Sequence, residues 1–146
     1  MLEANYHMKI FDWVYGLFIF AFIILLAWLF QNKNKKFKPV YAWYLPGLIA
    51  KMVGGISIVL IYVYYYGGGD ITAYFHNSKV IINTILEDPA LGLQFLLGEN
   101  RPELYSTFNA NTGVPFHYMY TNPQTWAVSR FSVPFVISGL GYILPA

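Results

Sequence analysis

The sequence predicts an all-α integral membrane protein with two to three transmembrane helices and amphipathic interfacial helices in an external loop. Three observations support this class. Only 11% of the 146 residues are charged and 20% are aromatic, whereas an ordinary soluble domain is about 25% charged. Two long apolar stretches occupy the first half of the chain, and a lysine-rich segment separates them. Shorter helical patterns with interleaved aromatic residues follow.

The first apolar stretch is Trp13–Phe30, about 18 uncharged residues, which is close to the minimum that crosses a bilayer. A signal peptide would need a basic segment before the apolar run and a small-residue cleavage site after it. Here Glu3 and Asp12 precede the run and lysines follow it. We therefore expect residues 1–12 to be an external N-terminus and residues 13–30 to be a transmembrane helix.

The second stretch is Leu45–Tyr66, with Pro46 in the first turn of the expected helix. It predicts a transmembrane helix over residues 45–66. Lys51 lies inside it, and either extends to the headgroups or pairs with a buried carboxylate or a lipid phosphate. Gly54 and Gly55 allow a partner helix of a membrane protein to approach closely.

The charge pattern predicts the orientation of both helices. The loop of residues 31–44 carries lysines and no acidic residue, at positions Lys33, Lys35, Lys36 and Lys38. Basic loops stay on the cytoplasmic side, so the N-terminus and the region after Tyr66 are expected outside a bacterial inner membrane. A patch that binds anionic lipid is a second interpretation of the same lysines.

The external region, residues 67–126, contains two predicted helices. The first is expected to begin with Asp70 as its N-cap. One of its faces is largely apolar, and consists of Ile71, Tyr74, Phe75, Ser78, Ile81, Ile82 and Ile85. Asp88 and Pro89 predict the start of a second helix that ends at Leu97 and is too short to span a membrane. We expect it to be interfacial or re-entrant.

From Gly98 onward the chain is expected to be an aromatic, amide-rich loop that lies in the headgroup zone or stacks on sugar rings. Asn122 and Pro123 predict a further helix, and residues 127–146 read as the start of a third transmembrane helix in a truncated chain. Arg130 is the only charge in that last segment.

The run Tyr64–Asp70, which reads YYYGGGD, places one carboxylate where the second span meets the membrane surface. Asp70 is either a helix cap or a general base, and the two roles are compatible. No phosphate-binding glycine loop, metal-ligand spacing of histidines or nucleophilic-serine motif accompanies it. One carboxylate is a poor divalent-cation site, and Glu99 and Glu103 add oxygens only if the loop folds back over Asp70. We therefore expect no cofactor, and the sequence leaves the use of a divalent cation open and unsupported.

Five further residues are candidates for binding a substrate beside Asp70. Cations at the outer leaflet can hold a lipid-linked diphosphate while a carboxylate accepts a proton from a sugar hydroxyl. The candidates are Tyr74, His76, Lys79, Arg101 and Arg130. Too few basic residues are present for a nucleic-acid interface.

The second apolar stretch, its tyrosine-rich end and the segment GGGDITAYF that follows resemble part of the EpsG-like bacterial membrane proteins, in which a glycine-rich, Asp-Tyr-Phe-containing segment follows the second span. The resemblance covers about residues 45–80. These are exopolysaccharide polymerases or glycosyltransferases of the GT-C type, which use polyprenyl-linked sugar donors. The resemblance implies that Asp70 is the base or a metal contact, and that Tyr74 and Phe75 complete the motif. Such proteins have many more spans, so the resemblance also implies an N-terminal part or a small relative that has lost activity.

Three classes of function therefore remain open from the sequence. The first is the membrane glycosyltransferase or polysaccharide polymerase. The second is a non-catalytic small membrane subunit of a secretion or respiratory complex, which the short length and the Gly54–Gly55 pair favour. The third is a transporter fragment, which Lys51 and the glycines and prolines of the last segment favour.

Overall fold

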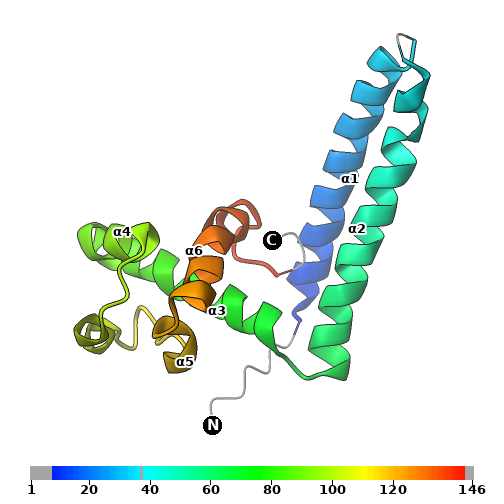
Figure 1. Cartoon of the computed structure of the whole chain (residues 1–146). Coiled ribbons are helices and arrows are strands. Elements are labelled where there is room, and N and C mark those ends of the chain that lie inside the picture. Colours follow the sequence, from blue (N-terminus) through cyan, green and yellow to red (C-terminus); the bar gives the residue numbers. More distant parts are fainter. Residues whose placement is uncertain (1–7, 37, 144–146) are drawn as a thin grey trace.

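The computed structural model describes residues 8–36 and 38–143, which form helices, turns and loops without a strand. Figure 1 shows two parts, a long hairpin made of α1 and α2 and a helical body made of α3 to α6. The body joins the hairpin at the end where α1 begins and α2 finishes. Glu3 and the last residues of the predicted third span, 144–146, lie outside the described residues.

The hairpin consists of α1 (Ile10–Asn34), a 3₁₀ turn η1 (Pro39–Trp43) and α2 (Tyr44–Leu60), which continues as a π-helical turn η2 (Ile61–Tyr65). Gln31 closes the tip, because its side-chain amide donates to the Ala42 carbonyl at 3.0 Å and accepts from the Leu45 amide at 3.0 Å. The ring of Phe30 also lies against Tyr41 and Tyr44. These contacts hold the two helices antiparallel at their lysine-rich end.

Both hairpin helices are long and apolar enough to cross a membrane. Their mean hydropathies are 2.5 for Ile10–Asn34 and 1.9 for Pro39–Tyr65. Only 11% of the first apolar window and none of the second is buried inside the protein. A helix in the core of a soluble protein would bury most of such a surface, because exposed apolar area is unfavourable in water. The helical character of the stretches 13–30 and 45–66 is thus confirmed, and their side chains face outward.

A turn of three glycines connects the hairpin to the body. Gly67, Gly68 and Gly69 have φ angles of 65°, 136° and 128°, a region that side-chain-bearing residues rarely adopt. The Gly68 amide donates to the Tyr62 carbonyl at 2.8 Å. A Cβ on Gly69 would come within 2.8 Å of the Tyr62 ring. Only glycine therefore allows the chain to leave the membrane-type helix and turn at this point.

This turn corrects the predicted start of the next helix. The N-cap of α3 (Asp70–Glu87) is Gly69, and Asp70 is its first helical residue. The Gly69 carbonyl already accepts the first helical hydrogen bond, from the Ala73 amide, and it also accepts from the Thr72 hydroxyl. Asp70 therefore does not cap the helix with its side chain, and its carboxylate is left exposed beside the helix N-terminus.

The body is built on α3, which packs against α4 (Pro89–Leu97) and α6 (Pro123–Ser138). The predicted starts of both partner helices are confirmed. Asp88 accepts hydrogen bonds from the Ala90 and Leu91 amides, and Asn122 accepts one from the Gln124 amide. In each case a proline occupies the first turn, where its missing N–H costs nothing.

Polar side chains join α3 to α6. Asn77 is fully buried and accepts from the Phe116 amide at 3.1 Å, while its own amide group lies 3.4 Å from the Ser129 hydroxyl. The Ser78 hydroxyl lies 2.7 Å from the Ser129 carbonyl. Small side chains at these positions allow the two helices to approach closely, and the hydrogen bonds satisfy groups that burial would otherwise leave unpaired.

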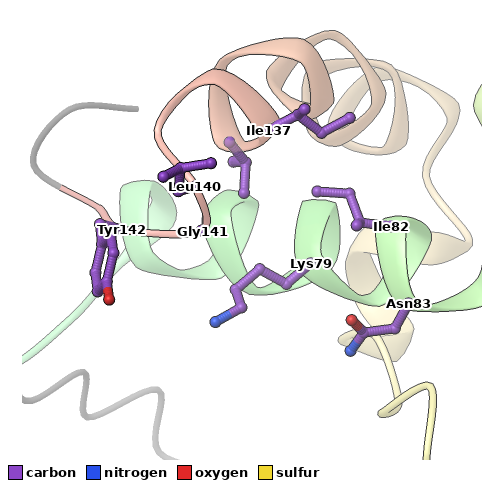
Figure 2. A pocket seen from close by; sticks show the side chains of 8 residues that line it. Lys79, Ile82, Asn83, Ile137, Leu140, Gly141 and Tyr142 are labelled. Carbon is purple, nitrogen blue, oxygen red and sulfur yellow. The ribbon is translucent and has the colours of Figure 1, made fainter. Parts of the chain in front are cut away.

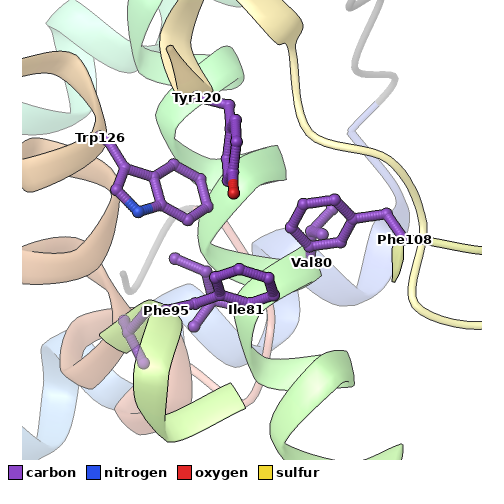
Figure 3. Close-up of a cluster of buried hydrophobic side chains, with 7 residues drawn as sticks. Val80, Ile81, Phe95, Phe108, Tyr120 and Trp126 are labelled. Atoms are coloured by element: carbon purple, nitrogen blue, oxygen red, sulfur yellow. The ribbon is translucent and has the colours of Figure 1, made fainter. Parts of the chain in front are cut away.

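The aromatic residues after Gly98 form the core of the body, as Figure 3 shows. Phe95, Tyr120 and Trp126 are at most 1% exposed, and Phe95 stacks on Phe108 with ring centroids 4.8 Å apart. The core members are Val80, Ile81, Phe95, Phe108, Tyr120, Trp126 and Val133. The expectation that these loop aromatics lie among headgroups or stack on sugars is therefore wrong for Phe108, Tyr120 and Trp126, because they pack against one another.

Two short turns support this core, η3 (Pro102–Thr107) and α5 (His117–Tyr120). The Tyr120 hydroxyl donates to the Arg101 carbonyl at 2.8 Å, and the Trp126 indole donates to the Glu99 carbonyl at 3.2 Å. Burial raises the pKa of Tyr120 to about 12, with smaller contributions from the carboxylates of Glu99 and Glu103. The phenol thus stays protonated at any physiological pH.

The last described segment returns to the hairpin. The Ile143 amide donates to the fully buried Asp12 carboxylate at 3.2 Å, and the Lys9 amide donates to the same carboxylate at 2.8 Å. A second apolar cluster of Phe75, Val136 and Ile143 packs against Val59 of α2. α6 ends at Ser138 and is not one of the two helices long and apolar enough to span. A third span over 127–146 stays a prediction.

The close approach of α3 and α4 can be tested at Gly92. A Cβ there would come within 2.5 Å of the backbone of Ile85, so Gly92→Ala must separate the two helices. We expect it to destabilise the protein by about 1–3 kcal/mol. The matched control is Gly54→Ala, because nothing lies within 4 Å of a Cβ at that helical position. Thermal unfolding in mild detergent, followed by circular dichroism, would contradict this packing if both variants melted alike.

Candidate functional site

The candidate site is centred on Asp70, which the glycine turn places at the foot of the hairpin. Its side chain is exposed at the first position of α3. Helix N-termini carry partial positive charge from unpaired N–H groups, which favours a carboxylate there. The preceding tyrosines, Tyr64, Tyr65 and Tyr66, are all exposed at the end of η2. The carboxylate is therefore accessible and lies just beyond an aromatic belt of the type found at membrane surfaces.

Two tyrosines lie near Asp70, and sequence reasoning identified only one of them. Tyr74 is half-buried one turn further along α3, on the same face as Asp70. Tyr118 comes from α5 and is 60% exposed. Burial raises the pKa of Tyr118, and the charges of Asp70 and Tyr74 raise it further. No spacing rule links Tyr118 to Asp70, because packing of the loop against α3 brings them together.

His76 and Lys79 face other directions. At about 3.6 residues per turn, the nine residues from Asp70 to Lys79 make two and a half turns, so Lys79 lies on the opposite side of α3. Its ammonium group sits 5.6 Å from the centre of the Phe75 ring. His76 has its Nε2 atom 2.9 Å from the Val114 carbonyl and its ring against Phe116. It holds the loop to α3, which is a structural role.

Neither Arg101 nor Arg130 forms an ion pair with Asp70 in the described part of the chain. Arg101 is exposed and forms an ion pair with Glu99, 3.0 Å between Nε and Oε1. Arg130 is next to Ser129, whose carbonyl contacts the Ser78 hydroxyl on α3. Ser78 lies eight residues after Asp70, or roughly 12 Å along the helix. The Arg130 guanidinium donates to the Leu96 carbonyl at 3.4 Å and covers the C-terminal end of α4. A cation there is stabilised by the helix dipole.

The acidic residues do not assemble a metal site. No group of three His, Cys, Asp or Glu side chains in the described part of the chain could hold a metal ion. Glu99 forms an ion pair with Arg101, and the charge of Glu103 raises the pKa of Tyr120. Neither carboxylate therefore folds back over Asp70. The arrangement thus offers one exposed carboxylate with two phenols, which can exchange a proton or bond to hydroxyl groups.

Two features of α2 stay open on the hairpin surface. Gly54 and Gly55 have nothing within 4 Å of a built Cβ, so a second helix could approach this face. Lys51 is exposed on the same helix.

Comparison with known proteins gives no family assignment. No protein-family model, curated protein or solved structure matches the chain. The resemblance to EpsG-like proteins therefore stays a prediction.

The proximity of Tyr118 to Asp70 predicts a measurable coupling. Asp70→Asn removes one of the charges that raise the pKa of Tyr118, so its titration midpoint should fall, while burial keeps it above the ordinary value. The matched control is Asp88→Asn, which removes the same charge at the other end of α3 and keeps a good capping residue. The ¹³Cζ tyrosine resonance, assigned with Tyr118→Phe, reports the midpoint. Equal shifts in both variants would contradict the arrangement.

Proposed function

We propose that this chain is an integral membrane protein and the N-terminal part of a glycosyltransferase or polysaccharide polymerase of a bacterial inner membrane. Its α1–α2 hairpin spans the bilayer, and a polyprenyl-linked sugar donor is used on the non-cytoplasmic face. The observation that supports it best is the direct passage from an apolar, outward-facing hairpin through the glycine turn to exposed Asp70. A lipid-linked substrate presents its reacting group at that depth, just outside the hydrocarbon.

The chemistry of the proposed site follows from its side chains. Asp70 accepts the proton of an attacking sugar hydroxyl, which is the role of a general base. The phenols of Tyr74 and Tyr118 can donate hydrogen bonds to the same sugar and offer ring faces to it. The Lys79, Arg101 and Arg130 cations do not gather at Asp70, so groups that bind the diphosphate must come from outside the described residues.

A second candidate is a non-catalytic membrane subunit. The open face at Gly54 and Gly55 favours it, since a partner helix fits against a surface that lacks side chains. In that case Asp70 stabilises the start of α3 and takes part in no reaction.

The membrane orientation can be tested by cysteine labelling, because the chain contains no cysteine of its own. Lys36→Cys at the hairpin tip and Asn111→Cys in the body are both exposed positions. An impermeant maleimide added to intact spheroplasts should label Asn111→Cys, and should label Lys36→Cys only after the membrane is permeabilised. Labelling of both from the outside would contradict a spanning hairpin.

The catalytic role is tested by Asp70→Asn in the host bacterium. Loss of a general base should reduce synthesis of the surface polysaccharide by roughly 10²-fold or more. Asp88→Asn, with the same charge change at a capping position, should leave the polysaccharide unchanged. If Asp70→Asn accumulates normally in the membrane and the polysaccharide level stays the same, Asp70 is not a base and the subunit interpretation gains support.

A further inference from the structure

A groove lies on the side of α3 that faces away from Asp70. It runs between α3, the end of α6 and the segment after it, and encloses about 440 Å³. Figure 2 shows Ile137 and Leu140 along one wall, and Lys79, Ile82 and Asn83 of α3 along the other. Its size is within the range of small-molecule sites in proteins, about 300–1,000 Å³.

The groove is lined by both apolar and polar side chains. Its apolar wall belongs to α6, which lies on the same side of α3 as the hairpin in Figure 1. The polar side chains are Lys79 and Asn83 of α3 and Tyr142 of the segment after α6. The Asn83 amide already donates to the Thr112 carbonyl at 3.2 Å, so Lys79 carries the only charge among these lining residues. Lys79 has no carboxylate within ion-pair distance among the described residues. A ligand that fits would have an apolar tail directed toward the membrane and an anionic head near the surface.

The depth of this groove also fits a membrane lipid. The cluster of Phe75, Val136 and Ile143 packs against Val59 in the last turns of α2. Val59 precedes Tyr65, the last residue of the π-helical turn, by six residues, or roughly 9 Å of helix. The end of α6 is therefore level with apolar residues of the hairpin, and below the tyrosines that mark its surface end.

The backbone beside the groove turns where α6 ends, in a left-handed cap whose Gly141 amide donates to the Val136 carbonyl at 2.8 Å. Leu140 has a φ of 50° and is 67% exposed, although glycine is the residue that suits this left-handed position. Here the cap keeps an exposed leucine on the wall of the groove.

We propose that this groove binds one anionic glycerophospholipid of the outer leaflet, with its phosphate at Lys79 and an acyl chain along Ile137 and Leu140. The site rests on the membrane placement of the hairpin and is separate from the Asp70 site. The phosphate supplies the anion that Lys79 lacks, and the acyl chain covers side chains that would otherwise face water or bulk lipid.

The test uses the full chain in nanodiscs of phosphatidylcholine that contain a minority of phosphatidylglycerol. After return to neutral detergent, native mass spectrometry measures the lipid retained per protein. The wild-type chain should retain phosphatidylglycerol in preference to phosphatidylcholine. Lys79→Gln should bind it about fivefold more weakly, the effect of one lysine at a membrane surface. Arg101→Gln, an equal charge change at an exposed residue of the body that does not line the groove, should bind it as the wild type does.

Leu140→Gly separates binding from folding. Glycine relieves the left-handed strain, so this variant should melt no lower than the wild type, yet it should retain less lipid because the apolar wall is shortened. Equal retention by Lys79→Gln and wild type, or equal retention of both lipids, would overturn the site. Displacement of phosphatidylglycerol by a lower concentration of polyprenyl phosphate would also overturn it, and would assign the groove to a substrate.

The lipid-retention measurement does not depend on the proposed catalytic role of Asp70. Asp70→Asn should retain phosphatidylglycerol fully, whatever it does to polysaccharide synthesis. The cysteine labelling detects a hairpin that fails to insert in the membrane. If the hairpin inserts and Lys79→Gln still retains phosphatidylglycerol as the wild type does, only the lipid site is refuted.

Discussion

The structure depends on one backbone constraint, the turn at Gly67–Gly69. All three residues have positive φ, and the Tyr62 ring fills the space that a side chain on Gly69 would need. The direction in which α3 leaves the hairpin follows from this turn, since no side-chain-bearing residue adopts such a path without strain. Because α4 and α6 pack against α3, the turn also determines where the whole body lies relative to the hairpin. The Asp12 carboxylate, bonded to the Ile143 amide, closes the same junction from the other end of the chain.

The two parts of the molecule are built for different surroundings. The hairpin has an outward-facing apolar surface, little of which is buried inside the protein. Its helices satisfy their backbone hydrogen bonds internally, as a segment without access to water requires. The body has an aromatic core and a buried polar contact of Asn77 and Ser78 with Ser129. Such a contact stabilises a specific pairing of helices because an unpaired polar group would be costly once buried. The junction is where the two kinds of surface meet.

Much of the fold was predictable because it depends on local patterns. Hydrophobic length predicted the hairpin helices, and the Asp-Pro and Asn-Pro pairs predicted the starts of α4 and α6. The N-cap of α3 was misplaced by one residue, since the positive φ of Gly69 is a property of the turn and not of the Asp70 side chain. The prediction that the aromatic residues after Gly98 lie at the membrane surface was wrong for Phe108, Tyr120 and Trp126, because membrane-surface belts and buried cores contain the same residue types. Only packing against Phe95 distinguishes them.

The candidate site was less predictable because nearness in sequence differs from nearness on a helix. His76 and Lys79 follow Asp70 closely, yet the helical period turns them to other faces, while Tyr118 arrives from a distant loop. The same period places Asp70 and Lys79 on two separate faces of α3. A lipid held at Lys79 would fix the depth of α3 in the membrane surface, and thereby the depth of the Asp70 carboxylate on its other side. The groove and the carboxylate are thus connected through one rigid helix, and an acid at a fixed distance from the hydrocarbon is what a lipid-linked substrate requires.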